Sequence, residues 1–85
     1  MLIHSPKELA LLVSNQRKKL KLSQADTGRS VGLKQQTVST FENKPEGTKL
    51  ETLFQILSAV NLDINIIPKN QNKKTSAKSQ WKEEW

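Results

Sequence analysis

A helical repeat of apolar residues opens the chain. Ser5, Pro6 and Glu8 combine an N-cap serine, a proline at the first helical position and a capping-box glutamate. Apolar residues then recur at helical spacing, and they are Leu9, Leu12, Val13 and Leu20. We therefore predict a helix over residues 6–20.

The next two helices are predicted to be shorter and to be separated by a glycine. Ser23 and Asp26, three residues apart, start a helix over residues 24–31. Gly32 supplies the left-handed conformation that ends it. A further helix over residues 35–43 follows almost directly, so the sequence predicts two short helices joined by a tight turn.

A fourth helix begins after a loop at residues 45–47. Thr48 and Glu51 have the spacing of another full capping box. The apolar stripe of this helix consists of Leu50, Leu53, Phe54, Leu57 and Val60. We assign Phe41, Phe54 and the leucines to the core.

The period of the pattern changes after this helix. Leu62, Ile64 and Ile66 alternate with polar residues, as in a half-buried strand, and Pro68 ends the run. A single strand has no partner within the chain, and isolated strands are not stable. The simplest resolution is that this strand pairs with the same strand of a second copy, which predicts a homodimer.

The two ends of the chain differ in composition, which predicts two regions. Residues 1–68 form an ordered domain, while residues 69–85 contain only Ala77, Trp81 and Trp85 as hydrophobic residues. Such a segment cannot bury enough surface to fold alone, so we expect a flexible basic tail. The two tryptophans are either accidental or anchors that fill a pocket on a partner protein.

Charge and composition narrow the function. The 85 residues include 14 Lys or Arg and 8 Asp or Glu, for a net charge of +6. This balance favours a polyanionic partner, nucleic acid before membrane. There is no cysteine, and the longest apolar run, at residues 9–13, is too short for a membrane span. No signal peptide is evident at the N-terminus, so we expect a cytoplasmic protein.

The fold class that these patterns predict is an all-α helix-turn-helix domain of four or more helices, with one short C-terminal strand. A helix-turn-helix places its second helix in the DNA major groove. The segments at residues 22–24, 32–33, 38–39 and 42 resemble the phage-repressor-like (XRE, Cro/C1) family over residues 9–62. Thr27 and Gly28 depart from that family's usual leucine and alanine, and Thr27 removes a core leucine.

A narrower resemblance links the chain to the HipB-type antitoxins. It is carried by residues 33–43, the Asn-x-Pro-x-x-Thr loop at 43–48, the fourth helix, the strand after it and the Glu84-Trp85 tail. Those proteins are dimeric repressors that bind palindromic operators and also inhibit a HipA-type Ser/Thr kinase toxin. The resemblance implies the same two partners for this chain and assigns Trp81 and Trp85 to toxin binding.

Candidate DNA-contacting residues gather on the third predicted helix. Lys34 occupies a capping position where a cation opposes the helix dipole, which points to a function such as donating to guanine or phosphate. Glutamine can pair with adenine. The resemblance puts Gln35 and Gln36 on base-reading positions. The residues assigned to bases are Lys34, Gln35, Gln36, Ser39 and Thr40.

A second set is assigned to phosphates, and it consists of Ser23, Gln24, Thr37, Asn43, Lys44 and Lys49. Ser23 has a sufficient role as an N-cap, whereas Gln24 has no core role and is better explained by DNA. For Lys18, Lys19 and Lys21 a solvated surface is the simpler interpretation. The XRE resemblance pairs Arg17 with Glu42 as a structural ion pair.

Three other functions can be compared with that of an antitoxin, and only the first remains as an alternative. A phage-type or housekeeping repressor without a toxin shares every feature of the body. An enzyme has no support, because His4 is the only histidine and nothing resembles a metal cluster or a nucleophile with its base. An RNA-binding adaptor lacks a stacking platform, since tyrosine is absent and both phenylalanines are predicted to be buried. No cofactor, metal or small-molecule ligand is expected.

Overall fold

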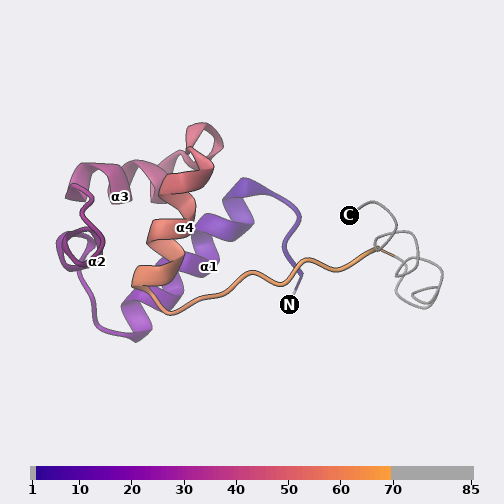
Figure 1. Cartoon of the computed structure of the whole chain (residues 1–85), viewed down its shortest axis with the longest axis horizontal. Coiled ribbons are helices and arrows are strands. Elements are labelled where there is room, and N and C mark those ends of the chain that lie inside the picture. Colours follow the sequence, from indigo (N-terminus) through magenta and orange to yellow (C-terminus); the bar gives the residue numbers. More distant parts are fainter. Residues whose placement is uncertain (1, 70–85) are drawn as a thin grey trace.

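The computed structural model of the chain describes residues 2–69 (Figure 1). This part contains four α-helices and one short 3-10 turn, which are α1 (Pro6–Lys19), α2 (Gln24–Ser30), α3 (Gln35–Asn43), η1 (Pro45–Gly47) and α4 (Leu50–Ala59). The predicted helical fold is confirmed, and the first three helices match their predicted ranges to within one residue. None of the helices described combines the length and apolarity needed to cross a membrane.

The N-cap serines predicted for α1 and α2 are both present, and α2 has a full capping box, whereas at α1 the Glu8 carboxylate bonds the backbone of His4 rather than that of Ser5. The Ser5 side chain accepts the Glu8 backbone N–H at 3.1 Å, while the Glu8 carboxylate accepts the backbone N–H of His4. At α2, the Ser23 hydroxyl accepts the Asp26 N–H at 2.9 Å and the Asp26 carboxylate accepts the Ser23 N–H at 3.2 Å. These bonds fix the starts of α1 and α2.

The predicted capping box at Thr48 and Glu51 was wrong. Lys49, not Thr48, is the N-cap of α4, and no side chain caps this end. Thr48 instead belongs to the preceding turn, because its backbone N–H donates to the Pro45 carbonyl at 3.0 Å. The short η1 turn therefore delays the start of α4 beyond the position that the box spacing indicated.

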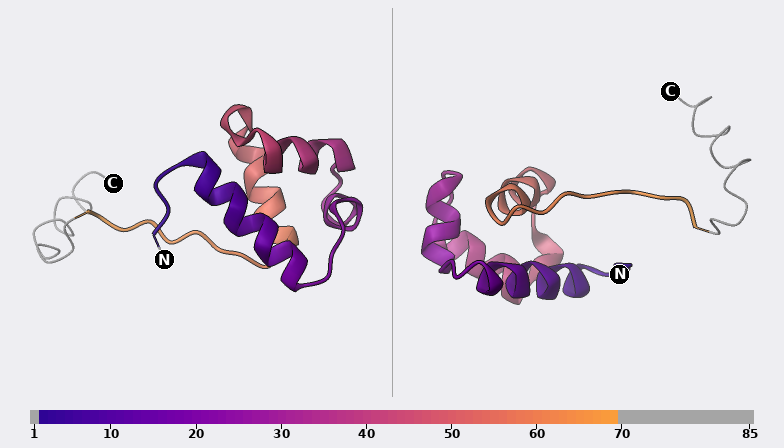
Figure 2. Two further views of the ribbon diagram at one scale, coloured as in Figure 1. Left: turned by 180° about the vertical axis from the view of Figure 1, so that it is seen from behind. Right: turned by 90° about the horizontal axis from the view of Figure 1, so that it is seen from below.

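The core lies where α1, α3 and α4 meet. Helix α4 passes in front of α1 in Figure 1, and α1 is in front when the molecule is seen from behind (Figure 2, left). The buried hydrophobic residues are Ala10, Val13, Val38, Phe41, Ile56, Leu57 and Val60. One cluster thus unites the first, third and fourth helices, and it leaves the outer face of each helix to solvent.

Several residues predicted to be in the core lie at the surface. Phe54 is 56% exposed and Leu50 is 71% exposed, and Leu11 and Leu20 are also exposed. Helix α4 turns a different stripe inward, in which Ile56 is fully buried. Residues 53, 56, 57 and 60 have the spacing of one helical face, so residues 50 and 54 belong to a neighbouring face. The assignment of Phe54 to the core was wrong.

The chain leaves α4 through a left-handed residue. Asn61 has φ 60°, and the Leu62 N–H donates to the Leu57 carbonyl at 2.9 Å, which closes the helix. Residues 62–68 then run away from the helices as an extended ribbon (Figure 1). No strand is present within residues 2–69. Pairing of residues 62–67 across a dimer therefore stays a prediction.

The predicted tail falls almost wholly beyond the described part of the chain. Trp81 and Trp85 lie outside the described residues, so their assignment to a partner stays a prediction from sequence. The division into a domain at 1–68 and a tail at 69–85 likewise stays a prediction.

Candidate nucleic-acid interface

Helix α3 has one buried face and one polar face. Val38 is fully buried and Phe41 is 2% exposed, so these two side chains anchor the helix in the core. The opposite side exposes Gln35, Gln36 and Thr40 to solvent. This division leaves the predicted base-contacting side chains free to reach into a groove, as a recognition helix requires.

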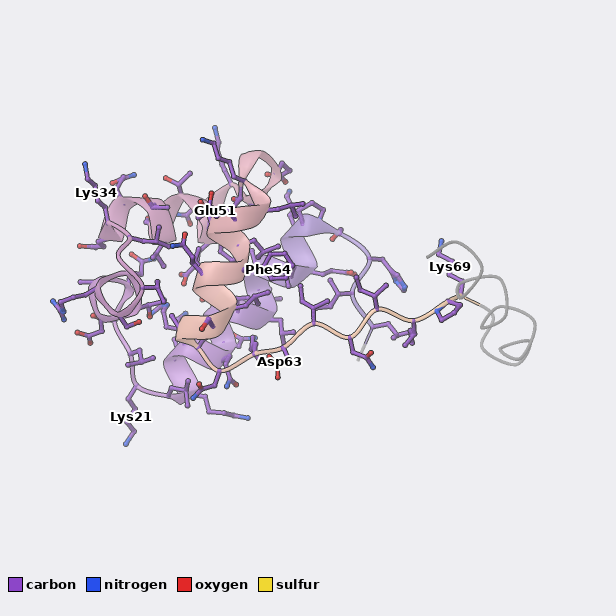
Figure 3. All side chains as sticks on the ribbon, in the orientation of Figure 1. Lys21, Lys34, Glu51, Phe54, Asp63 and Lys69 are labelled. Carbon is purple, nitrogen blue, oxygen red and sulfur yellow. The ribbon has the colours of Figure 1, made fainter. Side chains whose placement is uncertain are left out.

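The N-terminus of α3 carries no side-chain cap. Lys34 is the N-cap residue in an extended conformation, and its ammonium group has no acceptor with which to cap the first N–H groups of the helix. Figure 3 shows the Lys34 side chain at the outer end of α3, pointing away from the body. The helix dipole and the ammonium group both favour an anion here. The prediction that Lys34 breaks the capping rule is confirmed.

Weak contacts link polar side chains along α3. The Gln36 amide donates to the Thr40 hydroxyl at 3.4 Å, and the Asn43 amide donates to the Ser39 hydroxyl at 3.3 Å. Both pairs are four residues apart, so they line up along the helix. Ser39 is half-buried, unlike the exposed Thr40. Each amide uses one N–H in these long, weak hydrogen bonds, so its second N–H and its oxygen stay available for DNA.

The residues assigned to phosphates surround this helix. Thr37, Lys44 and Lys49 line a groove between α3, η1 and the start of α4, together with Thr40. Glu46 also lines the groove, so the groove carries one negative charge beside its two lysines. Lys44 and Lys49 are exposed, as is Asn43 at the end of α3. The structure therefore brings Lys44 and Lys49 to one groove beside the polar face.

Beneath α3 lies the ion pair that the family resemblance implied. The Arg17 guanidinium donates to both carboxylate oxygens of Glu42, at 2.7 and 3.1 Å, and also to the Leu22 carbonyl at 2.8 Å. The two side chains are 11% and 7% exposed. This fork joins α1 to the end of α3 and to the loop before α2.

Gln24 has a structural partner that the sequence did not reveal. Its amide donates to the Glu42 carboxylate at 3.1 Å, on the same oxygen that accepts the second Arg17 bond. The expectation that Gln24 has no role within the body was wrong. Its role as a phosphate contact stays a prediction, now with a side chain that Glu42 holds in place.

The ion pair determines the charge state of Glu42. Burial of Glu42 by itself favours the neutral acid and so raises the pKa. Hydrogen bonds from Arg17 and Gln24, with the positive charges of Arg17 and Lys18, outweigh that effect and lower the pKa of Glu42 below 4.5. Glu42 is therefore ionised at neutral pH.

Thr27 compensates for the leucine that the XRE pattern usually has at this position. The residue is 1% exposed, and its hydroxyl donates to the Ser23 carbonyl at 2.9 Å. The hydroxyl is thus satisfied within α2 rather than left unpaired in the interior. The substitution keeps α2 in contact with the core.

A second surface was predicted only in part, because Leu62 and Ile64 were assigned to a dimer strand while Phe54 was assigned to the core. Phe54, Leu57, Leu62 and Ile64 line a groove between α4 and the extended segment. Phe54 faces the viewer on α4 in Figure 3. Leu50, Ile66 and Ile67 on the same two segments are exposed as well. The signal in the sequence was the spacing of residues 50 and 54, which lie outside the stripe at 53, 56, 57 and 60.

Comparison with known proteins places these features in a family. The helix-turn-helix family model matches residues 13–67. Antitoxin HipB of Escherichia coli strain K12 is 36% identical over 64 residues, which cover 75% of this chain and 73% of that protein. The chain belongs to the HipB antitoxin family. HipB of Escherichia coli O6:H1 is also 36% identical, with 68% of its length covered.

Solved HipB structures share the whole arrangement of helices. HipB in a HipA-HipB-O2-O3 complex matches with a TM-score of 0.80 at 33% identity, covering 82% of this chain and 99% of that one. HipB in an O4 20mer complex matches with a TM-score of 0.79 and the same coverage and identity. The polar face of α3 and the apolar surface of α4 therefore belong to a HipB-type fold.

Proposed function

We propose that the chain is a dimeric DNA-binding antitoxin that represses its own transcription and neutralises a HipA-like Ser/Thr kinase toxin. The observation that carries the proposal is the polar, uncapped α3, held by the core on one side, in a chain of the HipB family. HipB itself occurs in a complex with HipA. The function is binding rather than catalysis, and its site of action is the cytoplasm.

In this proposal α3 reads bases and its surroundings hold phosphates. Gln35 and Gln36 present amides that can pair with adenine, and Lys34 can donate to guanine. The other base contacts are Ser39 and Thr40. Lys44 and Lys49 approach the backbone from the groove beside α3, and phosphate contacts fix the register of a protein on the duplex. Ser23, Gln24, Thr37 and Asn43 complete the phosphate set.

The rigidity of α3 supports this assignment. The Arg17 to Glu42 fork holds the end of α3 against α1, and Phe41 fixes its middle. Base recognition depends on donor and acceptor positions within a few tenths of an ångström, so a recognition helix must not move against its domain. A tightly held α3 meets that requirement.

The dimer in this proposal uses the second surface. Leu50, Phe54, Ile64 and Ile66 together leave an apolar surface that a monomer would expose to water. Pairing of residues 62–67 with the same segment of a second copy covers the isoleucines and satisfies the extended backbone. A twofold dimer presents two recognition helices about 34 Å apart, which matches palindromic half-sites one helical turn apart.

The toxin-binding part of the proposal rests on the sequence of the tail. Trp81 and Trp85 lie outside the described residues, and tryptophan is the residue most enriched at binding hot spots. Burial of one indole ring contributes several kcal/mol before ordering costs of the tail are subtracted. A net contribution of about 1–3 kcal/mol to toxin binding remains.

One truncation measured in two assays tests both activities. Duplexes selected from a random library by the full chain supply the DNA, and a HipA-like kinase supplies the toxin. We expect removal of Trp85 to weaken kinase binding about tenfold to a hundredfold and to leave DNA affinity at physiological salt unchanged. Equal losses in both assays would place Trp85 in the fold instead.

The same measurements separate the antitoxin from a repressor without a toxin. A full chain that selects a palindromic duplex but neither binds the kinase nor lowers its autophosphorylation would be a phage-type or housekeeping repressor. A full chain that selects no duplex would contradict the assignment of α3.

A further inference from the structure

Gly28 sits where there is no room for a side chain. It lies inside α2 and is buried. A Cβ atom added to it would stand 2.5 Å from the Leu33 carbonyl oxygen, 3.2 Å from the Leu33 carbonyl carbon and 3.3 Å from the Lys34 carbonyl oxygen. All three are backbone atoms, which cannot swing aside as the end of a long side chain can. An alanine at this position therefore requires the chain after the turn to move.

The backbone that would have to move is the start of the recognition helix. The Lys34 carbonyl accepts the N–H groups of Thr37 at 3.0 Å and of Val38 at 3.3 Å, which are the first hydrogen bonds of α3. Gly28 also holds this region from the other side, because its own carbonyl accepts the Leu33 N–H at 2.8 Å. The start of α3 is thus packed directly against Gly28.

The lack of space for a side chain distinguishes Gly28 from the other two glycines of the chain. A Cβ at Gly32 or Gly47 would meet nothing within 4 Å. Gly32 is needed for its φ of 76° instead. Alanine is the better helix former, so a glycine within the seven-residue α2 weakens that helix. The XRE pattern usually has alanine here, and this chain brings α2 and the start of α3 closer than alanine allows.

We propose that Gly28 is a positioning residue for sequence reading, because it sets where Lys34 and Gln35 enter the groove. The proposal rests on the DNA-binding function proposed above. With alanine, the 2.5 Å separation must open toward the 3.4 Å at which ordinary contact begins. Bidentate hydrogen bonds to bases tolerate such a shift poorly. Lys44 at the other end of α3 and Lys49 at the start of α4 have long, flexible side chains, which can keep a phosphate contact when α3 shifts.

The expected result is therefore a loss of specificity rather than of DNA binding as such. We expect Gly28→Ala to lower affinity for the selected palindromic duplex at least tenfold. Affinity for a scrambled duplex of the same length, measured at the same salt concentration, should change less than twofold. A residue that only supported stability would lower both affinities together or neither.

The experiment uses the full chain, Gly28→Ala and a control of matched stability. Ile56→Val removes a methylene from the core on α4, without adding an atom at the turn between α2 and α3, and is expected to lower the thermal midpoint without moving α3. Binding is measured at 10 °C, after circular dichroism has verified helix content, and the amide resonances of Lys34 and Gln35 are compared with those of the parent chain. These two resonances should shift in Gly28→Ala and stay in place in Ile56→Val.

The outcomes separate this proposal from the proposed function. A parent chain that selects no palindromic duplex would overturn the proposed function itself. A parent chain that selects one, with Gly28→Ala binding it within twofold of the parent affinity, would overturn only the role of Gly28. The role of Gly28 would also be overturned if Gly28→Ala stayed unfolded at 10 °C, or if Ile56→Val lost specificity to the same degree.

Discussion

The molecule carries two exposed surfaces with opposite chemistry. The surface around α3 presents amides, hydroxyls and lysines above a buried ion pair. The surface made by α4 and residues 62–67 presents Leu50, Phe54, Ile64 and Ile66, with no lysine or arginine among residues 50–68. Both lie on the same small core, yet they suit different kinds of partner.

The difference predicts opposite responses to salt. Contacts between lysines and phosphates weaken as salt rises, because the entropy gained by releasing counterions from DNA falls as the bulk salt concentration increases. Contacts between apolar surfaces persist at high salt, and sulfate or phosphate strengthens them. A pair of assays across one salt series can therefore tell which surface a given partner uses.

The largest effect should come from a charge in the apolar surface. Ile64→Asp places a carboxylate from each copy in the predicted seam, where an unpaired ion costs several kcal/mol. We expect self-association to weaken more than a thousandfold, or about 4 kcal/mol. Light scattering across a concentration series measures the result. A parent chain that stays a folded monomer at all concentrations would remove this surface as a dimer interface.

A smaller but still large effect should follow from breaking the ion pair under the polar surface. Glu42→Ala leaves the buried Arg17 guanidinium without its carboxylate and also removes the partner of Gln24. We expect the free energy of unfolding to fall by about 3 kcal/mol. Urea denaturation measures this loss, and Glu46→Ala, an exposed glutamate in η1, is the matched control.

The same pair predicts a dependence on pH. Because the pKa of Glu42 is lowered in the folded chain, its stabilisation is complete above the unfolded value of about 4.5. It is lost as the pH falls through the lower, folded value. We therefore expect Glu42→Gln to make stability less dependent on pH below 4.5 than in the parent chain. Parallel acid denaturation curves for the two chains would contradict this account.

The smallest effects should distinguish base contacts from phosphate contacts within the polar surface. Gln35→Ala should cost about 1–3 kcal/mol in each half-site and relax one base position. Lys49→Ala should instead weaken binding to all sequences and reduce the salt slope by about one unit in each half-site. Selection of duplexes and titrations over a salt series read out the two changes. An unchanged preference in Gln35→Ala would mean that α3 is not the reading helix.

The sequence predicted those features that depend on neighbouring residues. The N-caps at Ser5 and Ser23 and the turn at Gly32 act over three or four residues, so the helices that they delimit were predicted correctly. The capping box predicted at Thr48 was wrong because the 3-10 turn η1 uses the backbone N–H of Thr48. The spacing of residues alone does not reveal that competing turn.

Features that depend on tertiary packing were harder to predict. Phe54 and Leu50 are as apolar as the core residues, and only the direction in which α4 packs decides which of its two neighbouring apolar faces is buried. The bond from Gln24 to Glu42 joins residues 18 positions apart, and no local pattern marks it. The pair of Arg17 and Glu42 was inferred from family resemblance rather than from the pattern of residues.

The left-handed conformation of Asn61 has a consequence for the length of DNA that the protein measures. This residue fixes the direction in which residues 62–67 leave α4, and in the proposed dimer that segment lies on the twofold axis. The backbone conformation of Asn61 therefore sets the orientation of each recognition helix relative to the twofold axis of the proposed dimer. A change of a few degrees in the backbone angles of Asn61 would move the distant helix α3 by a larger amount. It would therefore alter the number of base pairs between half-sites without changing a residue that contacts DNA.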